Sequence, residues 1–103
     1  MSAASEAASD EERFMALVSD ICAADPKLTP VGAGLLAALH LGVCSDSRSF
    51  SRILGIAHAL VLREVTDLSG RRLLSVTSRN ERTQRAALAL TEDGQRILAT
   101  ASR

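Results

Sequence analysis

The sequence has few aromatic residues and cysteines, and it carries no net charge. Its 103 residues include two phenylalanines, two cysteines and no tryptophan or tyrosine, with twelve basic against twelve acidic side chains. Two cysteines, Cys22 and Cys44, are too few for the disulfide framework of a small secreted domain. The start of the chain also lacks the basic and apolar regions of a secretory signal. We therefore expect reduced thiols and a cytoplasmic protein.

Long hydrophobic runs are missing as well. The longest apolar stretch, residues 31–44, spans 14 residues, whereas a membrane helix needs about 20, so no membrane partner is expected. With 47% hydrophobic residues and balanced charge, the chain is too apolar for intrinsic disorder. We expect a disordered tail over residues 1–9, which are mostly Ala, Ser and Glu, and a single domain over residues 10–103.

Apolar residues recur at helical spacing through most of the chain. Together with capping signals, they predict helices over about residues 10–24, 30–41, 46–54, 56–69 and 92–101. The second helix is apolar over most of its circumference and should be the most buried. Glycines at 42, 55 and 70 follow or end three of these helices, and we expect Gly70 to adopt the left-handed conformation of a helix end.

The same spacing predicts which side chains face the core. In the third helix we expect Phe50, Ile53 and Leu54 to point inward. In the fourth, the expected inward residues are Leu60, Val61, Val65 and Leu68.

Beyond residue 70 the period changes from that of a helix to that of a strand. Leu74 and Val76, and then Leu88 and Leu90, alternate with polar or small residues, which predicts two strands. The segment between them, residues 78–85, is polar and basic and forms the tip of a hairpin. The expected fold is mainly α with a small β-hairpin wing: a winged helix-turn-helix of about five helices and two or three short strands.

Four short motifs, in this order, resemble the MarR family of winged-helix regulators. They are Leu-Thr-Pro at 28–30, Phe-Ser-Arg-Ile-Leu-Gly-Ile at 50–56, Leu-Leu at 73–74 and Leu-Thr-Glu-Asp-Gly at 90–94. The resemblance covers about residues 10–100. The closing Leu-Thr-x-x-Gly after a basic hairpin is more specific than the helix-turn-helix pattern alone.

The resemblance implies a transcriptional regulator that binds double-stranded DNA as a homodimer, paired through its terminal helices. The recognition helix, about residues 56–69, would enter the major groove, and the wing, residues 79–85, would lie on the minor groove or backbone. Many family members are released from DNA by a small-molecule effector. The side chains implied to contact DNA are Arg48, Arg52, His58, Leu62, Arg63, Arg79, Asn80, Arg82 and Arg85.

The chain departs from the family pattern at two places. Ala57, Ala59 and Leu60 stand where the family usually has small hydroxyl residues, so fewer hydrogen bonds to base edges are expected. Arg-Thr-Gln at 82–84 stands where Asp-Arg-Arg is common before the second strand. An alternative function is therefore a winged helix that binds another protein through apolar Ala57, Ala59, Leu60 and Leu62, without sequence-specific DNA binding.

Dividing the charges by position changes what the neutral total implies. Residues 1–46 hold two basic and seven acidic side chains, a net charge of −5. Residues 47–91 hold eight arginines and three acids, a net charge of +5. The basic half coincides with the predicted helix-turn-helix and wing, where arginine suits phosphate and minor-groove contacts. Salt bridges to nearby acids are the alternative role for these arginines.

Other chemistry has little support in the sequence. His40, expected to pack within its helix, and His58 have no ligand partners at metal-binding spacing, so neither a metal nor another cofactor is expected. No phosphate loop, nucleophile elbow or carboxylate pair is present, and we expect no enzyme. A redox switch at the cysteines remains an alternative to inert thiols. With Phe14 and Phe50 as the aromatics, a stacking pocket for a planar ligand is not indicated, although small apolar pockets are left open.

Overall fold

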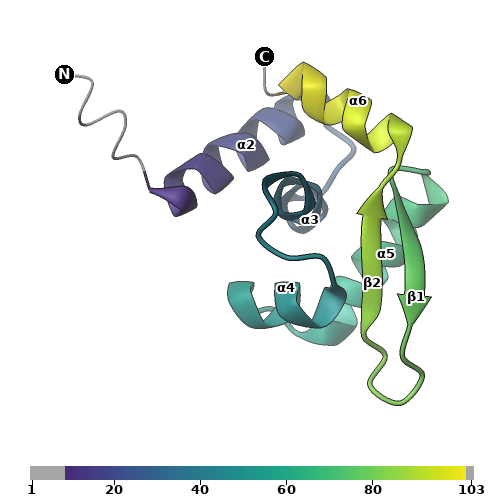
Figure 1. Ribbon diagram of the computed structural model, residues 1–103. Helices are drawn as coiled ribbons and strands as arrows, with labels where there is room; N and C mark the ends of the chain where they lie inside the picture. The colour runs from purple at the N-terminus through teal and green to yellow at the C-terminus, as the bar shows by residue number, and fades with distance from the viewer. Residues whose placement is uncertain (1–8, 102–103) are drawn as a thin grey trace.

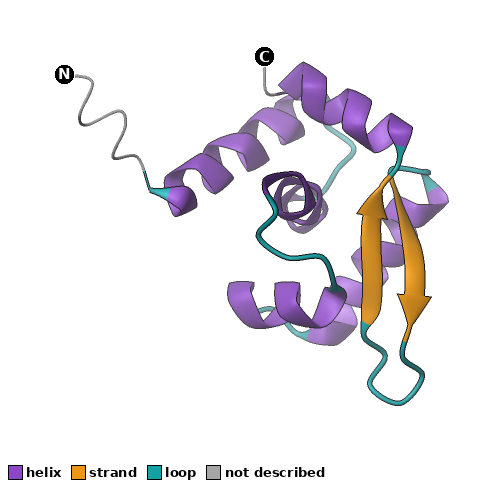
Figure 2. Cartoon of the chain, in the orientation of Figure 1, coloured by secondary structure: helices purple, strands orange, loops and turns teal. Residues whose placement is uncertain are grey.

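The computed structural model describes residues 9–101, which form five helices and one antiparallel hairpin (Figures 1 and 2). In chain order the elements are α2 (Asp10–Ala24), α3 (Pro30–Leu41), α4 (Ser47–Leu54), α5 (His58–Gly70), β1 (Leu74–Arg79), β2 (Ala86–Leu90) and α6 (Glu92–Ala101). This order confirms the predicted winged helix-turn-helix. Of the predicted tail, only Ser9 lies within the described residues.

Side-chain caps fix the starts of α2, α3 and α4, as predicted. The Ser9 hydroxyl accepts the N–H of Glu12, whose carboxylate in turn accepts the N–H of Ser9, which is a capping box at the start of α2. The Thr29 hydroxyl caps α3 by accepting the N–H of Gly32, with Pro30 at the first helical position. At the other ends, Gly42 and Gly55 adopt left-handed conformations with φ of 73° and 65°. Glycine takes such values most readily, so α3 and α4 stop at the residues just before Gly42 and Gly55.

The core forms around α3, which runs through the centre of the molecule (Figure 1). Residues 32–38 of this helix are all buried, so the prediction that it is the most buried helix is confirmed. Ile21 of α2, Val61 of α5 and Leu98 of α6 each have no exposed area. The core thus joins the terminal helices to the helix-turn-helix.

The predicted inward face of α4 is wrong for two of its three residues. Phe50 is buried, but Ile53 is 54% and Leu54 36% exposed. The buried face carries Ser47, Phe50 and Ser51 instead. Serines can occupy it because both hydroxyls find hydrogen-bond partners there, which compensates for their removal from water.

The predicted orientation of α5 needs a similar correction. Val61, Val65 and Leu68 are buried as expected, but Leu60 is 47% exposed. Leu62, expected to face DNA, is partly buried and packs against the core. Helical geometry explains why Leu62 is partly buried: it lies three residues before buried Val65 and shares its side of the helix.

The left-handed residue after α5 is Arg72, with φ of 63°, and not Gly70 as predicted. Gly70 is the last residue of the helix. The Leu73 N–H bonds back to the Leu68 carbonyl at 2.9 Å, and the Arg72 N–H to that of Ser69 at 3.0 Å. These two bonds define a Schellman motif, which requires the positive φ at Arg72 and buries Leu73.

The hairpin pairs β1 with β2, and its register shifts between Val76 and Ser78. A single bridge between Asp46 and Ala87 adds the segment before α4 to the other edge of β2. This bridge takes the place of the third short strand that the sequence analysis allowed. No helix among residues 9–101 is long and apolar enough to span a membrane.

Candidate nucleic-acid interface

A tight turn over residues 55–57 joins α4 to α5. The Ser51 hydroxyl donates to the Ile56 carbonyl, and the Ile56 N–H returns to the Ser51 carbonyl at 3.0 Å. Gly55 supplies the left-handed backbone between them. Three local features therefore set the angle between the two helices of the helix-turn-helix, which places α5 relative to any DNA groove.

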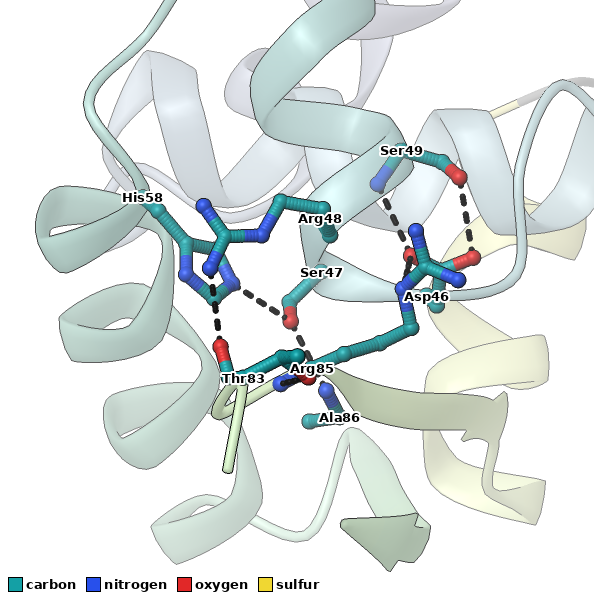
Figure 3. A network of polar contacts seen from close by, with 8 residues as sticks. All are labelled: Asp46, Ser47, Arg48, Ser49, His58, Thr83, Arg85 and Ala86. Carbon is teal, nitrogen blue, oxygen red and sulfur yellow. Dashed lines mark hydrogen bonds and ion pairs between the residues drawn. The ribbon is translucent and has the colours of Figure 1, made fainter. Parts of the chain in front are cut away.

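One buried hydroxyl connects this helix pair to the wing. Ser47 has no exposed area, and its Oγ accepts the backbone N–H of Ala86 at the start of β2, at 2.9 Å. The same Oγ lies 2.9 Å from Nε2 of His58, the first residue of α5 (Figure 3). A single side chain thus joins α4, α5 and β2.

Two arginine contacts hold the wing loop against α4 (Figure 3). Arg48 Nη2 donates to the Thr83 carbonyl at 2.8 Å, and Arg85 Nε lies 3.4 Å from the Asp46 carboxylate. Asp46 also caps α4 by accepting the N–H and hydroxyl of Ser49. Burial works against ionisation of Asp46, but the Ser49 hydrogen bonds and the charge of Arg85 together hold its pKa below its ordinary value. The carboxylate therefore stays charged and keeps both contacts.

The surroundings of His58 favour its neutral form. Burial and the positive charges of Arg48 and Arg85 lower the pKa of His58, while Asp46 opposes them. With the ring proton on Nδ1, the Ser47 hydroxyl donates to Nε2 while its oxygen accepts the Ala86 N–H. The neutral ring therefore satisfies the network without placing a third positive charge beside the two arginines.

Five of the nine predicted DNA contacts have a structural role in the folded chain. Arg48, His58 and Arg85 belong to the network just described. The side-chain oxygen of Asn80 accepts the N–H groups of Arg82 and Thr83 at 2.9 and 3.0 Å, which shapes the wing turn. Leu62 packs against the core. These residues help to position the surface. The side chains of the four polar ones already make hydrogen bonds or ion pairs within the folded chain.

The other four, Arg52, Arg63, Arg79 and Arg82, are exposed. They come from α4, α5, the end of β1 and the wing loop. The Arg79 guanidinium lies 3.4 Å from the Gln84 amide, and no other polar contact of these four side chains occurs within residues 9–101. The wing tip and α4 lie at the same end of the molecule (Figure 1). The exposed arginines of α4 and the wing therefore lie at one end, which also carries the exposed acid Glu81.

The sequence reasoning missed two polar residues on the exposed face of α5. Thr66 and Asp67 are exposed, three and four residues after Arg63, and so lie on the same side of the helix. The Thr66 hydroxyl donates to the Leu62 carbonyl at 3.1 Å. Helical spacing from Arg63 would have identified both residues.

The remaining titratable groups do not form a metal site. Within the described residues, no three His, Cys, Asp or Glu side chains gather closely enough to hold a metal ion. His40 is exposed and not packed as predicted. Both cysteines are free thiols, and burial, with a further contribution from Asp46, raises the pKa of Cys44.

Comparison with known proteins identifies the fold. No protein-family model matches the chain, and no curated protein matches it in sequence. Transcriptional regulator Tm0710 from Thermotoga maritima is 20% identical with a TM-score of 0.67, over 89% of this chain and 66% of its own. RV1404 from Mycobacterium tuberculosis is 21% identical with a TM-score of 0.62, over 89% of this chain and 64% of its own.

The chain thus spans about two thirds of the length of these solved structures. The likeness confirms the predicted winged-helix fold.

Proposed function

We propose that this chain is a DNA-binding transcriptional regulator of the MarR-like type, acting in the cytoplasm by binding and not by catalysis. In this proposal α5 enters the major groove and the wing contacts the minor groove or backbone. The observation that carries it is the set of exposed arginines on α4, α5 and the wing. The Ser47 network supports it further, because it fixes the wing to both helices.

Fluorescence anisotropy with a labelled duplex tests the proposal. The logarithm of the affinity should fall linearly with the logarithm of salt concentration, by about 0.9 for each phosphate neutralised. Arg82→Ala should weaken binding and lower this slope by about 0.9 if it neutralises one phosphate. Arg96→Ala is the matched control, because Arg96 lies on α6 and pairs with Asp93 at 2.8 Å. Absence of duplex binding at low salt would overturn the proposal.

A second candidate, a protein-interaction module, is favoured by the apolar part of the same surface. Ile53 and Leu60 are 54% and 47% exposed, and Ala57 and Ala59 are exposed beside them. Such a surface would bind a partner mainly by apolar burial, which depends weakly on salt. The salt titration therefore separates the two functions.

We further propose that the protein forms a homodimer through its terminal helices. α2 and α6 pack together at the end of the molecule opposite the wing tip, which leaves the helix-turn-helix free (Figure 1). On two half-sites the recognition helices should lie about 34 Å apart, one turn of DNA. Spin labels at position 66 of each copy would measure this separation, and a monomer by light scattering would contradict the dimer.

A further inference from the structure

A cavity lies on the side of the molecule where α2 faces α4 across the end of α3. Its volume is about 330 Å³, which is within the range of small-molecule sites. Phe14 of α2, Val43 after α3, and Ile53 and Leu54 of α4 form much of its wall. The latter three residues are also exposed at its edge, so the cavity opens onto an apolar surface.

The two aromatic rings of the chain meet in this cavity. Phe14 and Phe50 are 36 positions apart in the sequence, and both line it. The tips of both rings also lie near Gly34, each 3.6 Å from the position that a Cβ of this residue would take. The sequence alone did not indicate this pairing of rings.

The charged residues lining the cavity are both acidic, Asp10 and Glu11. The helix dipole favours acids at the start of α2, so their presence alone would not define a site. Their roles differ, however: Glu12 completes the capping box, and Asp10 lies 3.9 Å from Arg13. Glu11 makes no hydrogen bond or ion pair to any of residues 9–101. Its carboxylate is thus available to a charge in the cavity.

We propose that this cavity binds a lipophilic organic cation, such as an ammonium group carried on an aryl or branched alkyl body. The apolar wall, with the half-buried Phe14 ring at its surface, would bury the body. The face of an aromatic ring attracts a cation, and the Asp10 and Glu11 carboxylates add to this attraction. An anionic ligand of the same size would meet two negative charges and no basic lining residue.

Methyl NMR on the intact chain tests the site directly, without DNA, so the result does not depend on the proposed function. The probe is benzyltrimethylammonium, compared with its neutral isostere neopentylbenzene and with 4-tert-butylbenzoate. The cation should shift the methyl signals of Val43, Ile53 and Leu54 and saturate them at the lowest concentration. Equal binding of the neutral or anionic probe, or no saturable shift with the cation, would overturn the proposal.

Two variants and a control localise the binding. Glu11→Gln should weaken cation binding about two- to fivefold, which is typical of one exposed charge interaction. Glu92→Gln changes an acid in the first turn of α6, outside the cavity, and should change nothing. Val43→Phe fills the cavity from a 41% exposed loop position and should abolish binding while the chain stays folded.

A second copy of the chain is the competing occupant of this apolar face. In that case the same three methyl signals would shift with protein concentration in the absence of any probe. That result, or an affinity unchanged by Glu11→Gln, would contradict the cation site.

Discussion

Ser47 is the residue on which the position of the wing depends most. Its hydroxyl satisfies the buried N–H of Ala86 and contacts His58. In the sequence it belongs to a run of polar residues that predicts only a helix start. Its partners are 39 and 11 positions away, so no local pattern could reveal its role. The charge pattern, by contrast, located the basic segment, although it did not separate exposed Arg52 and Arg82 from Arg48, which bonds to Thr83.

Ser47→Ala should lower the free energy of unfolding by about 1–3 kcal/mol, because it leaves a buried backbone N–H without an acceptor. Urea denaturation followed by circular dichroism measures the loss. Ser45→Ala is the matched control, since Ser45 is exposed and contributes its carbonyl, not its hydroxyl, to the Leu88 N–H. Equal stability of the two variants would contradict this role for Ser47.

Leu60, if α5 reads DNA as proposed, should contact a thymine methyl group. It is 47% exposed in a part of the helix with few hydrogen-bonding side chains, and apolar residues recognise that methyl in the major groove. Deoxyuridine lacks only this methyl. In a duplex selected for binding, replacing the contacted thymine should weaken affinity about fourfold, the effect of one buried methyl.

Leu60→Ala should remove this preference, so that thymine and deoxyuridine duplexes bind alike. Anisotropy titrations of both duplexes against both proteins measure the effect. A parent protein indifferent to deoxyuridine at every position would show that Leu60 does not read the base.

At the level of elements, the sequence predicted helix bounds well and helix faces less well. Capping residues such as Ser9 and Thr29 act within four positions, so they can be recognised locally. The faces of α4 and α5 depend on packing against β2 and α3, which no local pattern reports. This is why Ile53, Leu54 and Leu60 were assigned to the core although the structure exposes them.

Phe50 and Leu54 should therefore differ in their contributions to stability. Phe50 is 1% exposed and Leu54 36%, so Phe50→Ala should cost about 3–5 kcal/mol and Leu54→Ala less than about 2 kcal/mol. Urea denaturation curves, fitted with one common dependence of the unfolding free energy on urea concentration, measure both losses of stability. Similar costs would place Leu54 in the core after all.

The junction of α4, α5 and the wing should respond to pH through His58. Its pKa in the folded chain lies below the ordinary 6.5, through burial and the charges of Arg48 and Arg85 against that of Asp46. Between these two pKa values the unfolded chain binds a proton that the folded chain does not, so stability should fall as the pH drops below about 6.5. At pH values well above 6.5, His58 is neutral in both states and does not lower the stability.

Comparing stability at pH 7.5 and 5.5 measures this loss. His58→Gln should reduce the difference, whereas His40→Gln should not, because His40 is exposed and outside the network. Against burial, the Ser49 hydrogen bonds and Arg85 hold the pKa of Asp46 below its ordinary value, so Asp46 stays charged throughout this range. An equal pH dependence in both variants would contradict the assignment to His58.

For the whole molecule, the neutral total conceals two charged regions with different surroundings. Exposed arginines lie on α4, α5 and the wing, while Asp10 and Glu11 border the cavity at the start of α2. The sequence predicted the first region from the +5 segment. It did not predict the cavity, because Phe14 and Phe50 are 36 positions apart and come together only through helix packing.

The position of a charge, and not the net charge, should therefore control DNA binding. Glu81→Gln and Asp20→Asn both raise the net charge by one, and both side chains are exposed. Glu81 lies in the wing loop, whereas α2, which carries Asp20, lies away from the wing tip (Figure 1). At about 0.15 M salt, charges interact over about 8 Å. Glu81→Gln should thus strengthen duplex binding measurably and Asp20→Asn should leave it unchanged, and an equal gain from both would show that net charge alone governs the affinity.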